Sequence, residues 1–175
     1  VVQHMLNFSR KQDIVFEKIN LNSVISNAIE LSTLRFKNSE LSMVFESSHE
    51  CYVDGSANHL EQVIVNLILN SLEAINEKKE SQPELLGAVK IALQKMEDRV
   101  LIKIEDNGIG ISESKGKKIF DPFFTSKKVG KGTGLGLSVS FNLINEHKGN
   151  ISFKSVEGVG TQFFIDLPCS KNELL

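Results

Sequence analysis

The nine residues QVIVNLILN at positions 62–70 carry the fold prediction, because they combine an apolar helix with a narrow polar stripe. Leucine, isoleucine and valine fill most positions, so a helix here leaves little surface for water. Gln62, Asn66 and Asn70 recur every four residues and lie on one helical face. A buried amide without a partner costs about 1–3 kcal/mol. The stripe therefore faces either solvent or a bound polar group, such as a metal–phosphate group whose Mg²⁺ an amide oxygen can ligate.

Outward from this segment, helical and strand patterns alternate along the chain. We expect helices at residues 21–37, from Ser56 or Asn58 to about residue 79, and at 135–147. The expected strands are 14–19, 41–46, 52–53, 89–95, 100–105, 151–155 and 162–167. Short turns between the last two pairs of strands imply antiparallel hairpins. The predicted fold class is α+β: a two-layer α/β sandwich with helices packed on one face of a mixed β-sheet.

Composition favours a single packed domain. The chain has 175 residues, of which 41% are hydrophobic and 24% charged, so a packed core is expected rather than disorder. The net charge of −2 argues against a nucleic-acid partner. Cys51 and Cys169 have no metal-ligand spacing, which favours a reducing, cytoplasmic setting. No apolar run approaches the roughly 20 residues that a membrane-spanning helix needs.

The segment Asp106-Asn107-Gly108-Ile109-Gly110 follows a predicted strand. A carboxylate at a strand end can accept a hydrogen bond from an exocyclic amine such as that of adenine. Gly108 and Gly110 allow the backbone to approach a flat ring closely. The alternative is a plain turn, because Asp-Asn-Gly is also favourable turn chemistry.

A second glycine cluster, GKGTGLGL at residues 130–137, opens a predicted helix. Exposed backbone N–H groups and the helix dipole make such a point attractive to phosphate. The spacing is neither that of a P-loop nor that of a dinucleotide-binding motif, and the chain lacks the signature set of serine/threonine kinases. A flexible glycine hinge is the alternative.

Three phenylalanines stand between the two glycine clusters, in Phe120-Asp121-Pro122-Phe123-Phe124. They either pin the loop to the core or anchor a mobile lid, and both roles are compatible. Lys127, Lys128 and Lys131 follow and could neutralise phosphate oxygens, although each could equally be a solvated surface lysine.

These motifs, in this order, resemble those of bacterial sensor histidine kinases. The N box, first glycine box, F box and second glycine box correspond to residues 62–70, 106–110, 120–124 and 130–137. The ending at residues 158–168 resembles the closing glycine–threonine hairpin of that family, and the resemblance spans roughly residues 14–168. Residues 70–74 and the short Phe-Phe-Thr-Ser-Lys lid look closest to the nitrogen-regulation type.

The resemblance implies a Bergerat-type ATP-binding fold of the GHKL superfamily over residues 14–175. Residues 1–13 would be the C-terminal end of the dimerisation and histidine-phosphotransfer helix, with a linker. The implied enzyme is a protein-histidine kinase that binds Mg-ATP and transfers the γ-phosphoryl group to a histidine on a dimerisation domain absent from this chain. A response regulator receiver domain would take the phosphoryl group next.

Further expectations concern assembly and the histidines. This stretch is expected to be monomeric and cytoplasmic, within a full-length homodimer that an inner-membrane anchor could hold. None of the four histidines, His4, His49, His59 and His147, matches the phosphate-accepting position. The last three are expected in surface or capping roles.

Site residues carry over from the resemblance by position. Asp106 would bind the adenine amino group, with Thr161 assisting through water, and Asn70 would hold Mg²⁺. Asn66 and Lys127 are the implied catalytic residues, and both also contact nucleotide. The remaining implied nucleotide-binding residues are Gly108, Gly110, Ile111, Phe120, Thr125, Gly132, Thr133, Gly134, Leu135, Gly136 and Leu137.

Two other function classes remain open. An ATP-driven conformational switch of the same superfamily carries a glutamate that activates water where Asn66 stands here, and an asparagine cannot act as that base. A nucleotide-free scaffold is the other alternative, and the intact Asp106, Asn70 and glycine clusters disfavour it.

Overall fold

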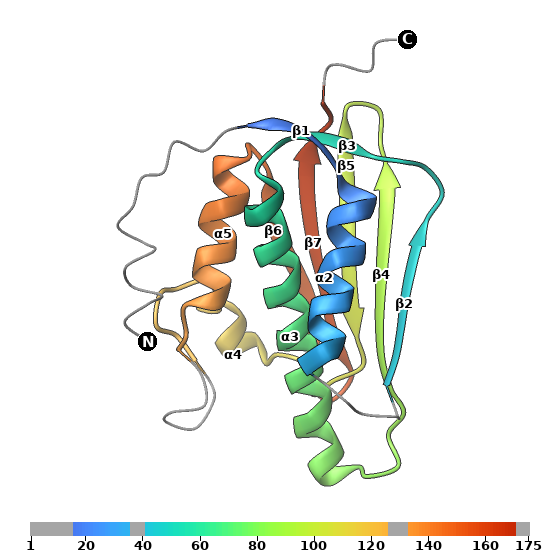
Figure 1. The fold of residues 1–175 in the computed structure, drawn as a ribbon. Coiled ribbons are helices and arrows are strands. Elements are labelled where there is room, and N and C mark those ends of the chain that lie inside the picture. Colours follow the sequence, from blue (N-terminus) through green and yellow to red (C-terminus); the bar gives the residue numbers. More distant parts are fainter. Residues whose placement is uncertain (1–15, 36–40, 126–132, 171–175) are drawn as a thin grey trace.

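The computed structural model describes residues 16–35, 41–125 and 133–170, and a five-stranded sheet forms its main layer (Figure 1). The strand order is β2-β4-β5-β7-β6. The strands are β2 (Leu41–Ser47), β4 (Gly87–Lys95), β5 (Arg99–Asp106), β6 (Asn150–Val156) and β7 (Gly160–Pro168). β2 runs parallel to β4, whereas the three other neighbouring pairs are antiparallel. The sheet is therefore mixed, as predicted.

Helices cover one face of this sheet. They are α2 (Leu21–Arg35), α3 (Ala57–Ser81) and α5 (Gly136–Glu146), and Figure 1 shows them side by side in front of the strands. A short helix, α4 (Glu113–Gly116), follows β5 and was not predicted. A separate antiparallel pair joins β1 (Glu17–Asn20) to β3 (Tyr52–Gly55). None of the described helices is long and apolar enough to cross a membrane.

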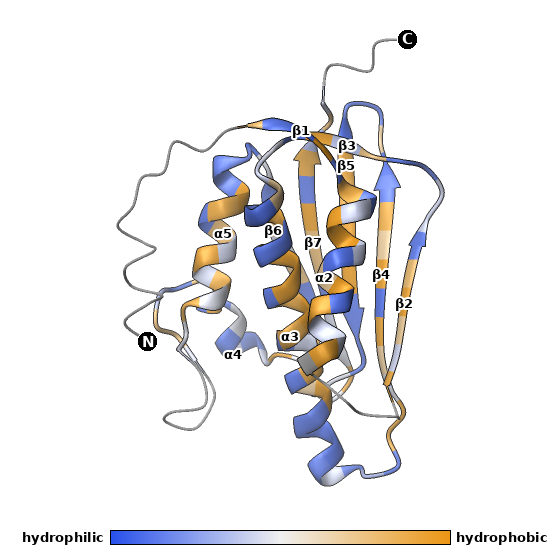
Figure 2. Ribbon diagram, in the orientation of Figure 1, coloured by the Kyte–Doolittle hydropathy of each residue, from blue (hydrophilic) through white to orange (hydrophobic). Residues whose placement is uncertain are grey.

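The core lies between α3 and the sheet. β5 and β7 alternate strictly between buried and half-buried positions, which is the period-2 pattern of strands with one covered face. In Figure 2 the strands are hydrophobic along much of their length, while the C-terminal end of α3 is mostly hydrophilic. The largest fully buried side chains come from both layers: Leu21, Ile25, Leu60, Ile64, Leu67, Ile68, Leu72, Ile75, Ile91, Leu93, Ile102 and Ile104.

Most expected elements are present with shifted ends. Ser56 caps α3, with its hydroxyl oxygen accepting from the His59 amide at 3.5 Å, so Ser56 and not Asn58 is the capping residue. The strand expected at residues 14–19 corresponds to β1. Residues 14 and 15 of the expected range lie outside the described residues. The small α4 was missed because four residues carry no hydrophobic period to detect.

Candidate nucleotide-binding site

Asp106 is the last residue of β5 and is only 6% exposed. The backbone amide of Gly108 donates a hydrogen bond to its Oδ1 at 2.9 Å. Burial raises the pKa of this carboxyl, and the Gly108 amide, the Ser71 hydroxyl, the Thr161 amide and Lys78 each act against that rise. The site thus contains a largely buried acid that local donors stabilise in its charged form.

Helix α3 packs directly against the loop after Asp106. A Cβ added at Gly108 would lie 2.7 Å from Ala74, so only a glycine lets this loop approach the helix so closely. The Ile109 amide donates to the Ala74 carbonyl at 3.1 Å. The first glycine box is therefore a glycine-dependent loop lying against α3.

Ser71, one helical turn before Ala74 and Ile75, is buried on the same side of α3. Its hydroxyl favours the charged form of Asp106, yet it is buried and makes no well-formed hydrogen bond to any of the described residues. The hydroxyl thus lies near the carboxylate without being firmly bonded to it. A buried hydroxyl that lacks a full partner beside a buried carboxylate fits a place that receives a polar ligand or a bridging water.

Ser155 joins two residues of the predicted set, Ile111 and Thr161. The Ile111 amide donates to Ser155 Oγ at 2.8 Å, and that oxygen lies 2.9 Å from Thr161 Oγ1. The Ser155 hydroxyl itself donates to the Gly160 carbonyl at 2.9 Å. Ser155 was not predicted, because a single serine within a strand carries no distinguishing pattern.

Asn66 connects α3 to α5. Its side-chain amide donates to Ser140 Oγ at 2.9 Å, and a Cβ added at Gly136 would collide with its Oδ1. The N-terminus of α5 therefore lies against the polar stripe of α3. Leu135 occupies the N-cap position and offers no side-chain acceptor, so it leaves the first amides of α5 uncapped. Uncapped amides beside an asparagine suit an anion.

The F box divides between the two roles that the sequence left open. Phe120 packs against Phe141 and Phe153, with ring centroids 5.6 and 6.1 Å apart, and so pins its segment to the domain. Phe123 is 68% exposed and has a positive φ of 65°. Gly134, also with φ near 65°, lies against the Phe123 backbone. This glycine of the second box is thus required by a close contact with the F box.

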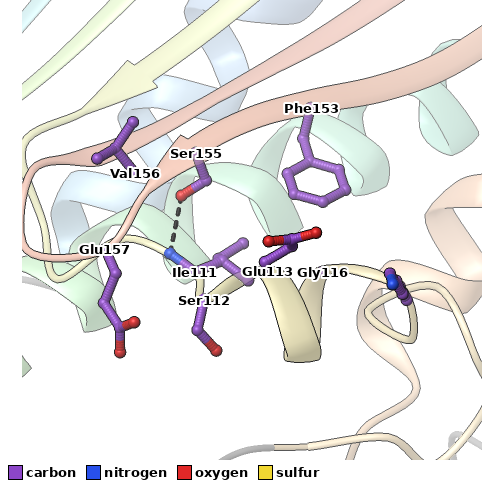
Figure 3. Close-up of a pocket in the computed structure, with 9 residues that line it drawn as sticks. Ile111, Ser112, Glu113, Gly116, Phe153, Ser155, Val156 and Glu157 are labelled. Atoms are coloured by element: carbon purple, nitrogen blue, oxygen red, sulfur yellow. Dashed lines mark hydrogen bonds between the residues drawn. The ribbon is translucent and has the colours of Figure 1, made fainter.

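A groove of about 620 Å³ opens beside the first glycine box rather than between Asp106 and Asn70 (Figure 3). It lies between residues 111–117 and β6, and the hydrogen bond from the Ile111 amide to Ser155 joins its two sides. Ile111 is the one member of the predicted set among the lining residues, which are Ile111, Ser112, Glu113, Gly116, Lys117, Phe153, Ser155, Val156 and Glu157. Neither Asp106 nor Asn70 lines this groove.

The other predicted residues are placed as follows. Asn70 is half-buried on α3, directly before Ser71, and Leu137 packs partly buried against the core. Thr125 and Thr133 are exposed, and the Thr133 hydroxyl accepts from the Leu135 amide at 3.4 Å. Gly110 has φ near 70°, and a Cβ added there would collide with the Val156 carbonyl oxygen. Lys127 and Gly132 lie outside the described residues, as do Lys128 and Lys131.

The described histidines have different environments. His147 caps the end of α5, as a capping role predicts, but it is 2% exposed and no surface residue. Its Nε2 accepts from the Ser56 amide at 2.9 Å, and its Nδ1 lies 2.7 Å from the Leu143 carbonyl. His49 is exposed, and His4 lies outside the described residues. Of the two roles expected for His147, the structure shows the capping one, and Gly55 of β3 lies against the buried ring.

Comparison with known proteins agrees with this geometry. Residues 55–171 match the family model described as histidine kinase-, DNA gyrase B-, and HSP90-like ATPase. The signal transduction histidine-protein kinase AtoS of Escherichia coli K12 is 34% identical over 170 residues, which are 96% of this chain and 26% of AtoS. Sporulation kinase E of Bacillus subtilis is 31% identical over 98% of this chain and 22% of that kinase. The chain thus spans about a quarter of these relatives.

Among solved structures, the catalytic domain of histidine kinase ThkA superposes with a TM-score of 0.73 at 32% identity, covering 87% of this chain and 97% of that domain. The mixed sheet with helices on one face is thus the fold of histidine kinase catalytic domains. With the family model matching most of its length, this chain belongs to the histidine kinase-, DNA gyrase B-, and HSP90-like ATPase family.

Proposed function

We propose that this chain is the ATP-binding catalytic domain of a sensor histidine kinase, acting on a histidine of a dimerisation domain and, through it, on a response regulator. The observation that carries the proposal is Asp106: a buried carboxylate held by the Gly108 amide where the loop packs on α3. Relatives of this chain are named histidine kinases, and histidine kinase ThkA, at 27% identity and a TM-score of 0.75, has been solved in complex with the response regulator protein TrrA. That match covers 99% of this chain and 47% of ThkA.

At the base end, Asp106 accepts a hydrogen bond from the adenine amino group, and Thr161 completes this edge through water. Gly108 keeps the loop thin enough for the ring to lie against backbone. Ser71 supports the base end with its incompletely bonded hydroxyl. These residues bind and orient the purine and take no part in bond breaking.

At the phosphate end, the amides that begin α5 and the glycines before them bind phosphate oxygens. Asn66 orients the triphosphate from α3, with its amide held by Ser140, and Lys127 neutralises charge. Asn70 would ligate Mg²⁺ with its amide oxygen, an oxygen donor of the kind Mg²⁺ accepts together with phosphate oxygens and water. Bound Mg²⁺ would supply charge neutralisation on the phosphates. Phosphoryl transfer to a histidine nitrogen then depends mainly on positioning.

The assembly around the domain follows the same proposal. In this proposal residues 14–175 form the catalytic domain; residues 1–13, assigned to the phosphotransfer helix and linker, lie outside the described residues. The domain works in the cytoplasm as a monomer when separate and within a homodimer when complete. The nitrogen-regulation subtype stays a prediction, since relatives of several kinds match at similar identity.

A calorimetric titration with Mg-ATP tests the proposal. The unaltered chain should release or absorb heat with one site, and Asp106→Asn should weaken binding by about 10–100-fold, because hydrogen bonds to a charged partner contribute about 1.5–3 kcal/mol. Lys90→Met, on the exposed side of β4, serves as the control and should bind normally. Absence of heat from the unaltered chain would contradict the proposal and favour the scaffold class.

Steady ATP hydrolysis would favour the conformational-switch class instead. Asn66 cannot act as a general base, and its amide nitrogen is already bonded to Ser140. Turnover that Asn66→Ala abolishes, with no phosphorylated protein formed, would therefore overturn the kinase assignment.

A further inference from the structure

Lys78 is a buried lysine near the C-terminal end of α3, and the motifs do not include it. Its side chain is 9% exposed. The ammonium donates to the Asn107 carbonyl at 2.9 Å and to the Val159 carbonyl at 3.2 Å. Those two acceptors belong to different segments, the loop after β5 and the turn between β6 and β7.

The position of Lys78 continues the polar stripe of α3. It lies eight residues after Asn70 and four after Ala74, so all three share one helical face. Along this face the helix presents Asn66 to α5, Ala74 to Gly108 and Lys78 to the two loops. This side of α3 thus contacts the start of α5, the first glycine box and the β6–β7 turn.

The β6–β7 turn, which Lys78 contacts through Val159, packs directly against the first glycine box. The Gly158 amide donates to the Ile109 carbonyl at 2.6 Å. A Cβ on Gly160 would collide with the Asp106 carbonyl, so turn and loop are in van der Waals contact. Releasing the turn would therefore loosen the backbone that presents Asp106.

An ammonium in such a place needs compensation, because burying a charge without partners is costly. Two carbonyls and the nearby Asp106 carboxylate provide it. An apolar side chain would fill the same space without this cost, so the lysine contributes something that packing does not require.

We propose that Lys78 is a positioning residue of the nucleotide site: its ammonium ties the loop after β5 and the β6–β7 turn to α3 and thereby fixes the Asp106 carboxylate for the base. This inference rests on the proposed function, in which Asp106 binds adenine. Lys78 does not touch the nucleotide and acts through Asp106.

The groups that act on Asp106 come from three elements. They are Ser71 and Lys78 of α3, the Gly108 amide of the following loop and the Thr161 amide of β7. Lys78 is the charged member of this set and helps to oppose the rise that burial causes in the pKa of Asp106. Removing its charge should thus raise that pKa further, so that Asp106 protonates at a higher pH.

The test measures Mg-ATP affinity by calorimetry across pH 5–8 in roughly half-unit steps, together with thermal melting. Lys78→Met should weaken binding about tenfold at neutral pH and should move the acid limb of the affinity profile to higher pH. Lys78→Arg keeps the charge and should restore the position of that limb. Lys90→Met removes an exposed lysine and should match the unaltered chain in affinity and in pH profile.

The outcomes separate this inference from the proposed function. Equal affinity and an equal acid limb in Lys78→Met would overturn the inference, as would a loss of affinity that is uniform across pH, which a purely structural role predicts. If Lys78→Met does not melt cooperatively, Lys78→Gln decides by the same shift of the acid limb. Failure of the unaltered chain to bind, or normal binding by Asp106→Asn, would instead remove the proposed function and the inference with it.

Discussion

Asp106 illustrates a residue whose function and stability contributions oppose each other. Burial raises the pKa of its carboxyl in the folded chain. A raised folded pKa means that stability is greatest below the unfolded pKa and is lost as the pH rises through the folded value. At neutral pH the ionised carboxylate therefore destabilises the nucleotide-free fold.

Asp106→Asn should accordingly stabilise the nucleotide-free chain while it weakens Mg-ATP binding. Asparagine keeps an oxygen for the Gly108 amide and removes the buried charge. We expect a melting temperature higher by about 2–4 °C at pH 7.5, as a gain of about 1 kcal/mol gives in a domain of this size. Differential scanning calorimetry without nucleotide provides the measurement. A lower melting temperature would mean that local donors outweigh the cost of burying the charge.

His147 predicts acid sensitivity at the residue scale. Burial lowers its pKa, and its Nε2 must be unprotonated to accept from the Ser56 amide. Leu143 and Glu146 favour the charged form, whereas the nearby His59 ring opposes it. A lowered folded pKa gives stability that is present above the unfolded value of 6.5 and is lost as the pH falls below it.

Urea unfolding at pH 7.5 and pH 5.5 checks this. The unaltered chain should lose stability towards pH 5.5, by at most about 1.4 kcal/mol per pH unit from this group. His147→Gln should be less stable at pH 7.5, because it loses ring packing, but should show a smaller difference between the two pH values. Equal pH differences in both proteins would exclude His147 as the source.

At the scale of elements, the contact between α3 and α5 controls the phosphate end of the site. Asn66 holds Ser140, and Gly136 leaves room for the Asn66 amide. The glycines of the two glycine boxes avoid different collisions. A side chain at Gly136 would meet the flexible side chain of Asn66, whereas one at Gly110 or Gly134, both at positive φ, would meet backbone atoms.

Gly136→Ala should therefore fold but bind nucleotide less well. The added methyl group meets Asn66 Oδ1, which must move away from the start of α5. Because alanine also favours a helix by about 1 kcal/mol over glycine, we expect little change in melting temperature and an affinity for Mg-ATP lower by roughly tenfold.

Gly134→Ala is the matched comparison, since it strains backbone at positive φ and should lower the melting temperature as well. Unchanged affinity in Gly136→Ala would show that the position of Asn66 does not limit binding.

At the scale of the whole molecule, the environments of the histidines indicate whether incubation with labelled ATP can phosphorylate this chain. His147 is buried with both ring nitrogens bonded, and His59, in the first turn of α3, has a buried Nδ1. His147 therefore presents no free ring nitrogen to a phosphoryl donor. His49, which follows β2, is exposed, and its Nδ1 lies 2.8 Å from the Ser48 hydroxyl.

We expect Mg-ATP binding without stoichiometric phosphohistidine. Acid-labile, alkali-stable label measured after incubation should stay well below one phosphate per chain, while the melting temperature rises with nucleotide as expected for a ligand of the folded state. A separately supplied dimerisation domain should accept the label. Stoichiometric label on this chain alone would contradict the prediction, and substituting His4, His49 and His59 in turn would locate it.

The sequence by itself determined the elements and the order of the motifs, because hydrophobic period, capping residues and glycine spacing are local properties. It therefore predicted α3 with its polar stripe and the mixed sheet, whereas the role of Asp106 stays a prediction. Tertiary structure alone decided which side chains meet: Lys78 with Val159 across 81 positions, and Ile111 with Ser155 across 44. The first pair depends on how the β6–β7 turn packs on α3 and the second on how the loop after β5 lies against β6, and local sequence patterns do not specify such packing. The burial of His147 has the same origin, since β3 and α5 enclose a residue whose own neighbours are exposed.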